Sequence, residues 1–228
     1  MSLKVYYDLM SQPARAVVLF CKANKIPFTP KPVALRKYEH QSEEYGLISP
    51  FRKVPVIQDG DFTLTESVAI LQYLADRFDC PDHWYPKDPK ARGKVQEYMA
   101  WQHWNTRMHC ATVFIQEVIL PKATGNPPDE GKLSKHVAAM NTTLTNMENF
   151  FLKDTPYISG HQISIADLLG VCEVVQVSAS GRDVTADHPK IATWIKRVRE
   201  ELSPHFDEVF TVINRVRDMS LKQQKSKL

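Results

Sequence analysis

The first 80 residues combine strand-like and helix-like hydrophobic patterns. Apolar side chains at alternate positions from Leu3 to Tyr7 predict a strand, and the apolar stretch after Pro13 predicts a helix over residues 13–24. Residues 28–33 look extended, but the two prolines within them cannot donate ladder hydrogen bonds. We therefore expect this segment to be an edge strand.

The segment after residue 50 predicts an antiparallel hairpin and a closing helix. Strand-like residues 54–58 and 61–64 flank Asp59-Gly60, a typical two-residue hairpin turn, and residues 65–78 have a helical apolar pattern. The order β-α-β followed by β-β-α needs a right-handed parallel crossover and then an antiparallel pair. We expect an α/β unit of the thioredoxin-like kind, with a mixed four-stranded sheet and helices packed on it.

Three prolines close together, Pro81, Pro86 and Pro89, interrupt both patterns and predict a linker. Beyond them no strand signal competes, and helical patterns cover residues 89–120, 132–152, a segment from Ser164, 189–202 and 204–217. We expect the first of these helices to end at Pro121 and at the Gly-Asn-Pro-Pro run over 125–128. The predicted organisation is a thioredoxin-like domain at 1–80, a linker at 81–89, an all-α domain at 90–217 and a polar basic tail at 218–228.

Residues 163–168, Ile-Ser-Ile-Ala-Asp-Leu, contain a capping box. Ser164 is the expected N-cap, Asp167 stands three residues later, and the flanking Ile163 and Leu168 are placed to form a hydrophobic staple. Because such a motif fixes the start of a helix, we assign Ser164 and Asp167 a structural role and not a catalytic one.

Composition and charge narrow the classes of function. The 228 residues are 43% apolar and 24% charged, which is ordinary for a globular protein, and no apolar run approaches the ~18 residues of a membrane span. The first residues show no secretory signal, so we expect a cytoplasmic protein. The formal charge is +3, of which residues 215–228 carry +4, which leaves about −1 for the rest. We favour a solvated end over a basic arm for nucleic acid or a membrane surface.

The four cysteines, Cys21, Cys80, Cys110 and Cys172, lie far apart in the sequence. They form no CxxC motif and no cluster with metal-ligand spacing. We expect reduced, mostly buried thiols and no metal site.

Ser11 lies where a predicted strand passes into a helix that opens near Pro13. Its hydroxyl could simply cap that helix. It could instead donate to an anion, because unpaired backbone N–H groups and the positive end of the helix dipole converge there. No histidine lies nearby in the sequence, so a hydrolase-type serine nucleophile is not supported.

The thiol of a bound ligand could lose its proton, and Ser11 could stabilise the resulting thiolate. Lowering a thiol pKa by two units from about 8.5 requires about 2.7 kcal/mol. A hydrogen bond to a charged group supplies about 1.5–3 kcal/mol, and a helix terminus adds up to about 2 kcal/mol. The two together suffice to keep a bound sulfur ionised near neutral pH.

Two further segments could bind an extended peptide. A cis bond between Val54 and Pro55 would leave the Val54 backbone free to pair with a peptide, although a trans Pro55 at a strand start is the alternative. At Thr65-Glu66-Ser67, exposed N–H groups and the Ser67 hydroxyl could bind a carboxylate and Glu66 an ammonium group, but ordinary capping explains the tripeptide equally well.

His40 and Lys53 are candidates for a second carboxylate, or else solvated surface residues. The features together describe a site for a short zwitterionic peptide with a thiol in its middle. Glutathione is such a peptide.

Several motifs stand in a fixed order that covers nearly the whole chain. They are Tyr7-x-Asp-Leu-x-Ser11-Gln-Pro-x-Arg15, Lys53-Val-Pro, residues 59–70, Trp84-Tyr85-Pro86, residues 97–103, and Gly160-x-x-Ile163-Ser164-x-Ala166-Asp167. In this combination the chain resembles the cytosolic glutathione transferases, and within them the theta class.

The resemblance implies a homodimer in which Ser11 stabilises the glutathione thiolate, with no metal and no cofactor beyond the co-substrate glutathione. It implies glutathione contacts at His40, Lys53, Val54, Glu66 and Ser67, with Gln12 as a further candidate. It also implies an electrophile pocket between the domains, for which Trp104 and Arg107 are candidates; Arg107 could equally be a surface residue.

The expected reaction is attack of the thiolate on small hydrophobic electrophiles, such as alkyl or aralkyl halides and epoxides, or on the oxygen of organic hydroperoxides. A non-catalytic binding or scaffolding protein of the same fold is the alternative, because a fold alone does not set the function. Several vertebrate theta enzymes continue into a further apolar helix over the pocket, whereas residues 221–228 are polar here. We therefore expect a more open site.

Overall fold

Alternating apolar residues pair four strands into one mixed sheet in the computed structural model, which describes residues 3–225. The strands are β1 (Leu3–Tyr7), β2 (Phe28–Pro32), β3 (Val56–Asp59) and β4 (Phe62–Thr65). They lie in the order β2-β1-β3-β4, with β1 parallel to β2 and the other two pairs antiparallel. The thioredoxin-like α/β arrangement, the edge position of β2 and the hairpin are confirmed.

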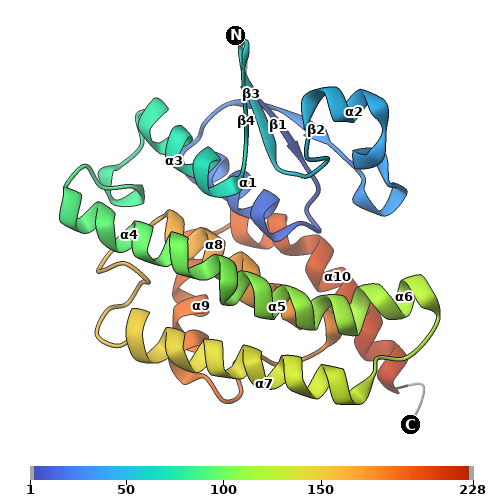
Figure 1. Cartoon of the computed structure of the whole chain (residues 1–228). Helices are drawn as coiled ribbons and strands as arrows, with labels where there is room; N and C mark the ends of the chain where they lie inside the picture. The colour runs from blue at the N-terminus through green and yellow to red at the C-terminus, as the bar shows by residue number, and fades with distance from the viewer. Residues whose placement is uncertain (1–2, 226–228) are drawn as a thin grey trace.

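The helices of this part are α1 (Gln12–Ala23), α2 (Glu43–Ile48) and α3 (Ser67–Arg77), with the short 3₁₀ helices η1 (Leu35–Lys37) and η2 (Glu39–Gln41). Figure 1 shows α1 and α3 between the sheet and the helical part of the molecule. The pattern did not predict α2, because it has six residues and buries only the side chain of Tyr45. One turn and a half is too short to display a helical period.

The second part is helical, as predicted. Its α-helices are α4 (Pro89–Trp101), α5 (Thr106–Phe114), α6 (Leu120–Thr124), α7 (Glu130–Asn146), α8 (Ile165–Gln176), α9 (Pro189–Glu201) and α10 (His205–Lys225). In Figure 1, α4 to α6 follow one another across the molecule, α7 runs alongside them, and α8 to α10 lie behind. Within residues 3–225, no helix is long and apolar enough to cross a membrane.

The prediction of one helix over 89–120 that ends at Pro121 is wrong. Asn105, with φ −122° and ψ −99°, separates α4 and the 3₁₀ turn η4 (Gln102–Trp104) from α5. The π-type turn η5 (Ile115–Ile119) then leads into α6, which has Pro121 near its start. A proline is tolerated there because the first N–H groups of a helical segment need no partner within it.

The predicted tail at 218–228 is also wrong in part, because α10 continues through Lys225. The Ser220 hydroxyl donates a 2.9 Å hydrogen bond to the carbonyl oxygen of Ala179, which anchors these last turns. Residues 226–228, like Met1 and Ser2 at the other end, lie outside the described residues. The predicted linker contains a 3₁₀ turn, η3 (Asp82–Trp84), and its Trp84 and Tyr85 are buried in the core.

The capping box at the start of α8 is confirmed, with Ser164 as the N-cap. Asp167 is fully buried, and its Oδ2 accepts the Ser164 N–H at 2.9 Å. Its Oδ1 accepts the Ile158 N–H at 2.9 Å and the Trp194 indole N–H at 2.8 Å. The carboxylate therefore joins the start of α8 to a preceding loop and to α9.

Candidate active site

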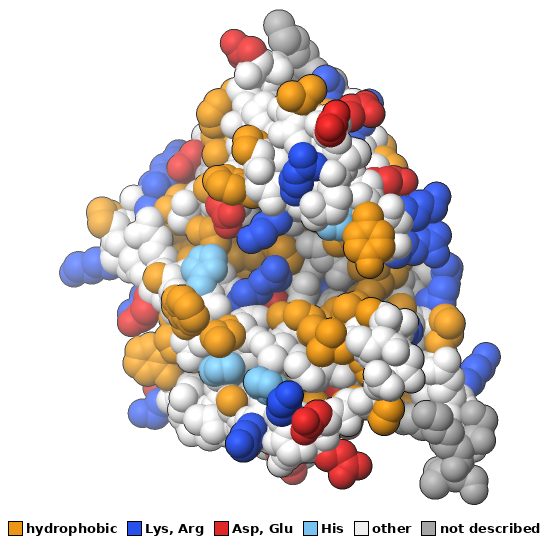
Figure 2. Space-filling model, turned by 45° about the vertical axis from the view of Figure 1, so that its right-hand side comes forward, with side chains coloured by type: hydrophobic (Ala, Val, Ile, Leu, Met, Phe, Trp, Pro, Cys, Tyr) orange, Lys and Arg blue, Asp and Glu red, His pale blue; other side chains and the backbone are white. Residues whose placement is uncertain are grey.

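A cavity of about 230 Å³ lies between the sheet part and the helical part. Figure 2 shows the molecule hollowed between its upper and lower parts, with Lys and Arg side chains gathered at the hollow. Of the predicted site residues, those that line the cavity are Lys53, Val54, Pro55, Glu66, Ser67 and Arg107. A larger hollow of about 1000 Å³ involves α6, η7 (Val177–Ser180) and α10, and none of the predicted residues lines it.

Ser11 is the N-cap residue of α1, and only 9% of its surface is exposed. Its carbonyl oxygen accepts the N–H of Arg15 at 3.0 Å, but its hydroxyl forms no capping hydrogen bond. The first turn of α1 contains no acidic residue that would offset the positive end of the helix dipole. Ser11 itself is not among the cavity-lining residues, whereas Pro13, two residues later, is.

The Val54–Pro55 peptide bond is cis, as one of the two sequence interpretations expected. Pairing of β3 with β1 and β4 starts at Val56, so the Val54 backbone lies outside the ladder and at the cavity. Lys53 is fixed by its backbone, because its carbonyl oxygen accepts the Tyr45 hydroxyl at 2.9 Å and the Ser49 hydroxyl at 3.1 Å.

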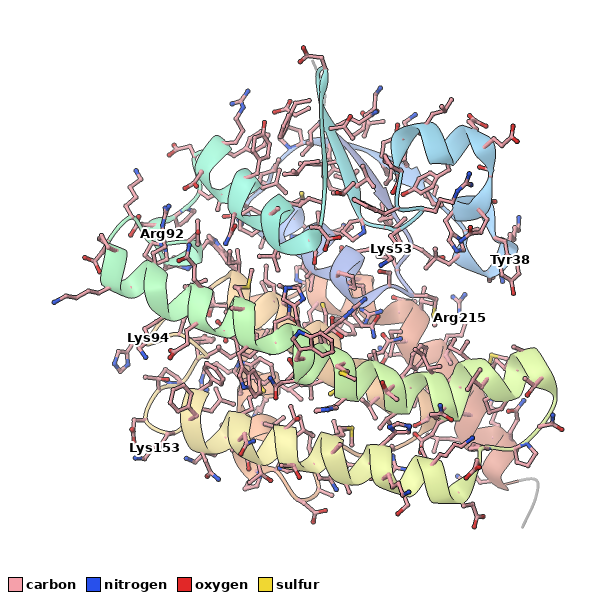
Figure 3. The ribbon with its side chains drawn as sticks, in the orientation of Figure 1. Tyr38, Lys53, Arg92, Lys94, Lys153 and Arg215 are labelled. Carbon is pink, nitrogen blue, oxygen red and sulfur yellow. The ribbon has the colours of Figure 1, made fainter. Side chains whose placement is uncertain are left out.

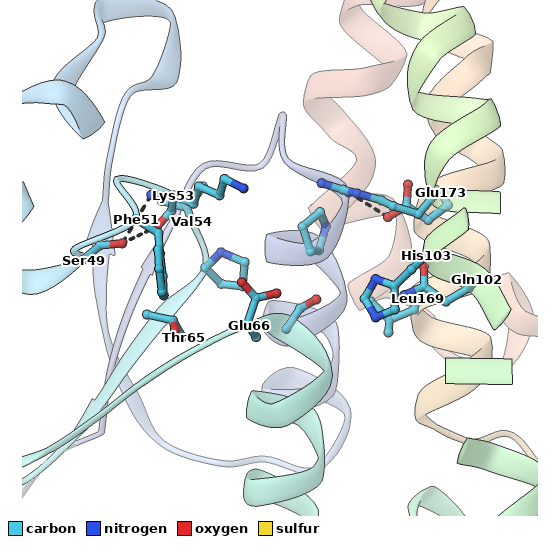
Figure 4. A pocket seen from close by; sticks show the side chains of 14 residues that line it. Ser49, Phe51, Lys53, Val54, Thr65, Glu66, Gln102, His103, Leu169 and Glu173 are labelled. Atoms are coloured by element: carbon cyan, nitrogen blue, oxygen red, sulfur yellow. Dashed lines mark hydrogen bonds and ion pairs between the residues drawn. The ribbon is translucent and has the colours of Figure 1, made fainter. Parts of the chain in front are cut away.

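The Lys53 side chain extends from this anchored backbone into the cavity, toward the wall on which Glu173 lies (Figure 4). In Figure 3, Lys53 lies at the edge of the sheet part that faces the helical part. The charge of Lys53 is therefore available to a ligand in the cavity.

Glu66 and Ser67 form the junction of β4 and α3. Glu66 is the N-cap residue of α3 and has a left-handed backbone, with φ 66°. Its side chain makes no capping hydrogen bond, and Ser67 is the first residue of the helix. Both side chains line the cavity, so the N-terminus of α3 faces it.

Besides Ser11, three predicted site residues lie outside the cavity lining. His40 is half-buried, stacks on Tyr38 with ring centroids 6.3 Å apart, and its Nδ1 has no partner among the described residues. Gln12 is buried in the first turn of α1. Trp104 is 75% exposed and is not among the lining residues, so the structure does not bring it to this pocket.

Arg107, by contrast, is held at the cavity wall by a buried acid. Its Nη1 lies 2.8 Å from Oε1 of Glu173, a carboxyl with an exposed fraction of only 1%. Burial raises the pKa of Glu173, while the nearby Arg107 and Arg15 oppose that rise. The cavity wall therefore contains an ion pair whose acidic half is buried in α8.

The sequence interpretation did not single out Glu173, Gln102 or Leu169, which also line the cavity. Glu173 had a detectable signal, since it is an acidic residue in the otherwise apolar segment Ile165–Val175 that also contains the capping Asp167. A charge in such a segment costs free energy unless it is paired, so it indicates a specific partner. Gln102 and Leu169 had no comparable signal, because their roles depend on how α4 and α8 meet.

Comparison with protein-family models matches two segments of the chain. Residues 1–76 match the model of the glutathione S-transferase N-terminal domain, and residues 104–201 match that of the glutathione S-transferase C-terminal domain. Curated relatives include glutathione S-transferase theta-1 of Bos taurus and of Homo sapiens. Each is 41% identical over 96% of this chain and 91% of the relative.

Solved structures resemble this one over nearly their whole length. The apo form of human glutathione-S-transferase T1-1 matches with a TM-score of 0.92 and 41% identity, covering 95% of this chain and 91% of that one. A human theta-class glutathione transferase in complex with the glutathione conjugate of 1-menaphthyl sulfate also matches with a TM-score of 0.92. It is 36% identical, over 98% of this chain and 92% of that one.

Proposed function

Because the chain belongs to the theta class of the glutathione S-transferase family, we propose that it joins glutathione to small electrophiles at the cavity between its two parts. One arrangement of chemical groups supports this proposal. The Ser11 hydroxyl makes no capping hydrogen bond at the start of α1, and the adjoining cavity combines the α3 N-terminus, the Val54 backbone and the Lys53 ammonium group.

Each part of glutathione has a matching group in this arrangement. The N-terminus of α3 and Ser67 suit the α-carboxylate, and Glu66 suits the ammonium group. The Val54 N–H and C=O suit the central peptide backbone by strand addition. We assign Lys53 to the second carboxylate, with His40 as a further candidate for it. We assign Ser11 to the sulfur, and the adjoining Gln12 is a further candidate contact.

The chemical step requires a thiolate and a nearby electrophilic atom. The Ser11 hydroxyl donates a hydrogen bond to the sulfur and keeps its proton. The positive end of the α1 dipole further favours the thiolate over the thiol. The thiolate attacks an electrophilic carbon, a carbon–sulfur bond forms, and the halide leaves or the epoxide opens. Catalysis then consists of thiolate supply and of holding the two reactants together.

Organic hydroperoxides are a second substrate class for the same thiolate. Attack on the peroxide oxygen breaks the O–O bond and yields an alcohol and glutathione sulfenic acid. A second glutathione reduces the sulfenic acid to the disulfide and water, so the two glutathione molecules supply both electrons. Neither reaction requires a cofactor other than glutathione.

A turnover survey with glutathione tests the proposal. We expect measurable conjugation of alkyl or aralkyl halides or of epoxides, with cumene hydroperoxide reporting the peroxidase reaction. Retention on immobilised glutathione without turnover of any electrophile would instead favour the non-catalytic binding protein. Absence of both retention and turnover would contradict the glutathione site itself.

We also propose that the protein is a homodimer of the cytoplasm. Large apolar side chains remain exposed on the sheet part, notably Leu47, Phe51 and Phe62, and burial against a second copy would remove them from water. The four cysteines are unpaired, as expected of a reducing compartment. Light scattering tests the dimer, since it distinguishes the chain mass of 26.1 kDa from twice that value.

A further inference from the structure

The loop between β1 and α1 carries the Ser11 hydroxyl, and both parts of the molecule bind its backbone. Its N–H groups are bound within the loop itself. The Met10 N–H donates to Oδ1 of Asp8, and the Ser11 N–H donates to the Asp8 carbonyl oxygen, both at 2.9 Å. The carbonyl oxygens of Leu9 and Met10 are instead contacted by side chains of α1 and α8. The position of Ser11 therefore depends partly on how α8 packs against this loop.

Gln176 makes the contact from α8 to this loop. It is the last residue of α8 and is fully buried. Its Nε2 lies 3.4 Å from the carbonyl oxygen of Met10, the residue before Ser11. Its Oε1 accepts a hydrogen bond from Nη2 of Arg15. The amide therefore acts on the loop directly, at Met10, and also through Arg15.

Arg15 completes the second connection from Gln176 to the loop. It is fully buried in α1, and its Nη1 donates a 2.7 Å hydrogen bond to the carbonyl oxygen of Leu9. Its Nη2, which donates to Gln176, also donates to the carbonyl oxygen of Cys172 at 3.0 Å. Its backbone N–H donates to the carbonyl oxygen of Ser11 at 3.0 Å. Every step from Gln176 to the loop is therefore a hydrogen bond.

A primary amide is chemically suited to the place between Arg15 and Met10. A guanidinium only donates hydrogen bonds, a carbonyl oxygen only accepts them, and a primary amide does both. A carboxylate at residue 176 would accept from Arg15 but would offer the Met10 carbonyl oxygen no donor. A hydrocarbon would offer neither group. Gln176 is also not among the residues that line the cavity, so its effect on a ligand there passes through the loop.

We propose that Gln176 is a positioning residue for Ser11, because its amide fixes the Met10 carbonyl group and the Arg15 guanidinium at the same time. The proposal rests on the proposed function, in which Ser11 stabilises the glutathione thiolate. It assigns Gln176 no contact with glutathione. The effect of Gln176 is to keep the Ser11 hydroxyl within hydrogen-bonding distance of the sulfur.

Gln176→Met tests this role without changing a charge. Methionine is unbranched and similar in size to glutamine, but it has no N–H donor and only a weak acceptor. Because both side chains are neutral, the substitution places no new charge near the sulfur. A loosened loop weakens the hydrogen bond from Ser11 to the thiolate, and this raises the pKa of the bound thiol. A rise of about one unit leaves roughly tenfold less thiolate at a pH well below that pKa.

The experiment titrates the thiolate absorbance of glutathione bound to the full-length protein and measures kcat over the same pH range. It compares the unmodified protein with Gln176→Met, Gln176→Asn and Thr143→Val. Gln176→Asn keeps the amide but is one methylene shorter, so it cannot keep both contacts. It also carries the test if Gln176→Met does not fold.

Thr143→Val is the matched control. Thr143 is buried in the helical part, and its Oγ1 lies 2.6 Å from Nδ1 of His109, so it joins α7 to α5 as Gln176 joins α8 to α1. Thr143 does not line the cavity. Its substitution removes a buried hydrogen bond between helices and leaves the contacts of the Ser11 loop in place.

We expect both Gln176 variants to raise the thiol pKa by about one unit, with little change in KM for glutathione. Their kcat should fall about tenfold at a pH well below the pKa and much less above it, while the control keeps the pKa of the unmodified protein. An unchanged or lowered thiol pKa in the Gln176 variants would overturn the proposal. A loss of kcat that is equal at every pH would overturn it too, because thiolate supply would then not be the cause.

Two further outcomes have separate meanings. A parallel rise of the thiol pKa in Thr143→Val would overturn the role of Gln176, since the effect would then follow from any loosening of the helical part. If the unmodified protein itself forms no bound thiolate, the proposed function fails, and the role of Gln176 fails with it.

Discussion

Arg15 donates a 3.0 Å hydrogen bond to the carbonyl oxygen of Cys172, a residue 157 positions later in the chain. The bond connects α1 of the sheet part to α8 of the helical part. The same guanidinium lies 4.9 Å from the ring centroid of Phe210 in α10, so three helices meet at one buried cation. Arg15 therefore stabilises both the loop that carries Ser11 and the interface between the two parts.

Arg15→Ala should destabilise the whole molecule. The substitution leaves the carbonyl oxygens of Leu9 and Cys172 without this donor and removes one of the two cations near Glu173. Breaking a buried charged network in this way costs about 3–5 kcal/mol. Urea unfolding measures the change, with Arg36→Ala, an exposed site, expected to stay within about 0.5 kcal/mol of the unmodified protein. Equal stability of the two variants would contradict a supporting role for Arg15.

Ser11→Ala should lower turnover tenfold or more while the affinity for glutathione changes little. The hydroxyl is expected to contact only the sulfur, and a hydrogen bond to an anion contributes about 1.5–3 kcal/mol. Steady-state kinetics and equilibrium glutathione binding measure the two quantities separately. Unchanged turnover would remove Ser11 from the mechanism.

Glu66→Gln should weaken glutathione binding. If the carboxylate accepts the ligand's ammonium group, the loss of its charge raises the dissociation constant by about tenfold, at the lower end for a charged hydrogen bond. Calorimetry measures the change. Asp61→Asn is a suitable control, because Asp61 is an exposed acid at the turn of the same hairpin and does not line the cavity. An unchanged dissociation constant for Glu66→Gln would show that Glu66 does not bind the ligand.

Buried thiols should make the protein less stable at alkaline pH. Burial raises the pKa of Cys21 and of Cys172 to about 12, far above the value of about 8.5 for a free thiol. Between these values the unfolded chain loses thiol protons that the folded chain keeps. The stability present below about pH 8.5 therefore falls as pH rises, by up to about 1.4 kcal/mol per pH unit for each thiol.

Urea unfolding at a series of pH values from about 8 to 10 measures this loss, with the free-thiol pKa as its starting point. Cys21→Ala should have a shallower decline than the unmodified protein, because one of the titrating thiols is absent. Identical declines in the two proteins would show that Cys21 does not contribute.

Local patterns were sufficient where neighbouring residues determine the structure. The Asp59-Gly60 hairpin, the capping box at Ser164 and the cis Val54–Pro55 bond each depend on a few adjacent residues, and all three were predicted correctly. The predictions failed at two other places. The helix over 89–120 is broken at Asn105, which the helical pattern does not reveal. Helix α10 continues into the predicted tail, where Ser220 makes a distant contact with Ala179.

The residues of the candidate site also fall into those that local patterns could predict and those that they could not. Lys53, Val54, Glu66 and Ser67 were identifiable because a strand start and a helix start place them, and all four line the cavity. Trp104 was expected at the electrophile pocket from its position in the chain, but it is largely exposed. Its side chain direction depends on the 3₁₀ turn η4, which the helical pattern does not reveal.

The sequence by itself determined the strands of the sheet, the all-α second part, the family and the local groups suited to glutathione, because hydrophobic periods, turn residues and caps act over short distances. Only the tertiary structure decided that Glu173 pairs with Arg107 at the cavity, and that Arg15 joins the Ser11 loop to α8. A buried charge is stable only with a partner, and that partner can come from anywhere in the chain. The link between the two parts of the molecule therefore becomes visible only once α1 is packed against α8.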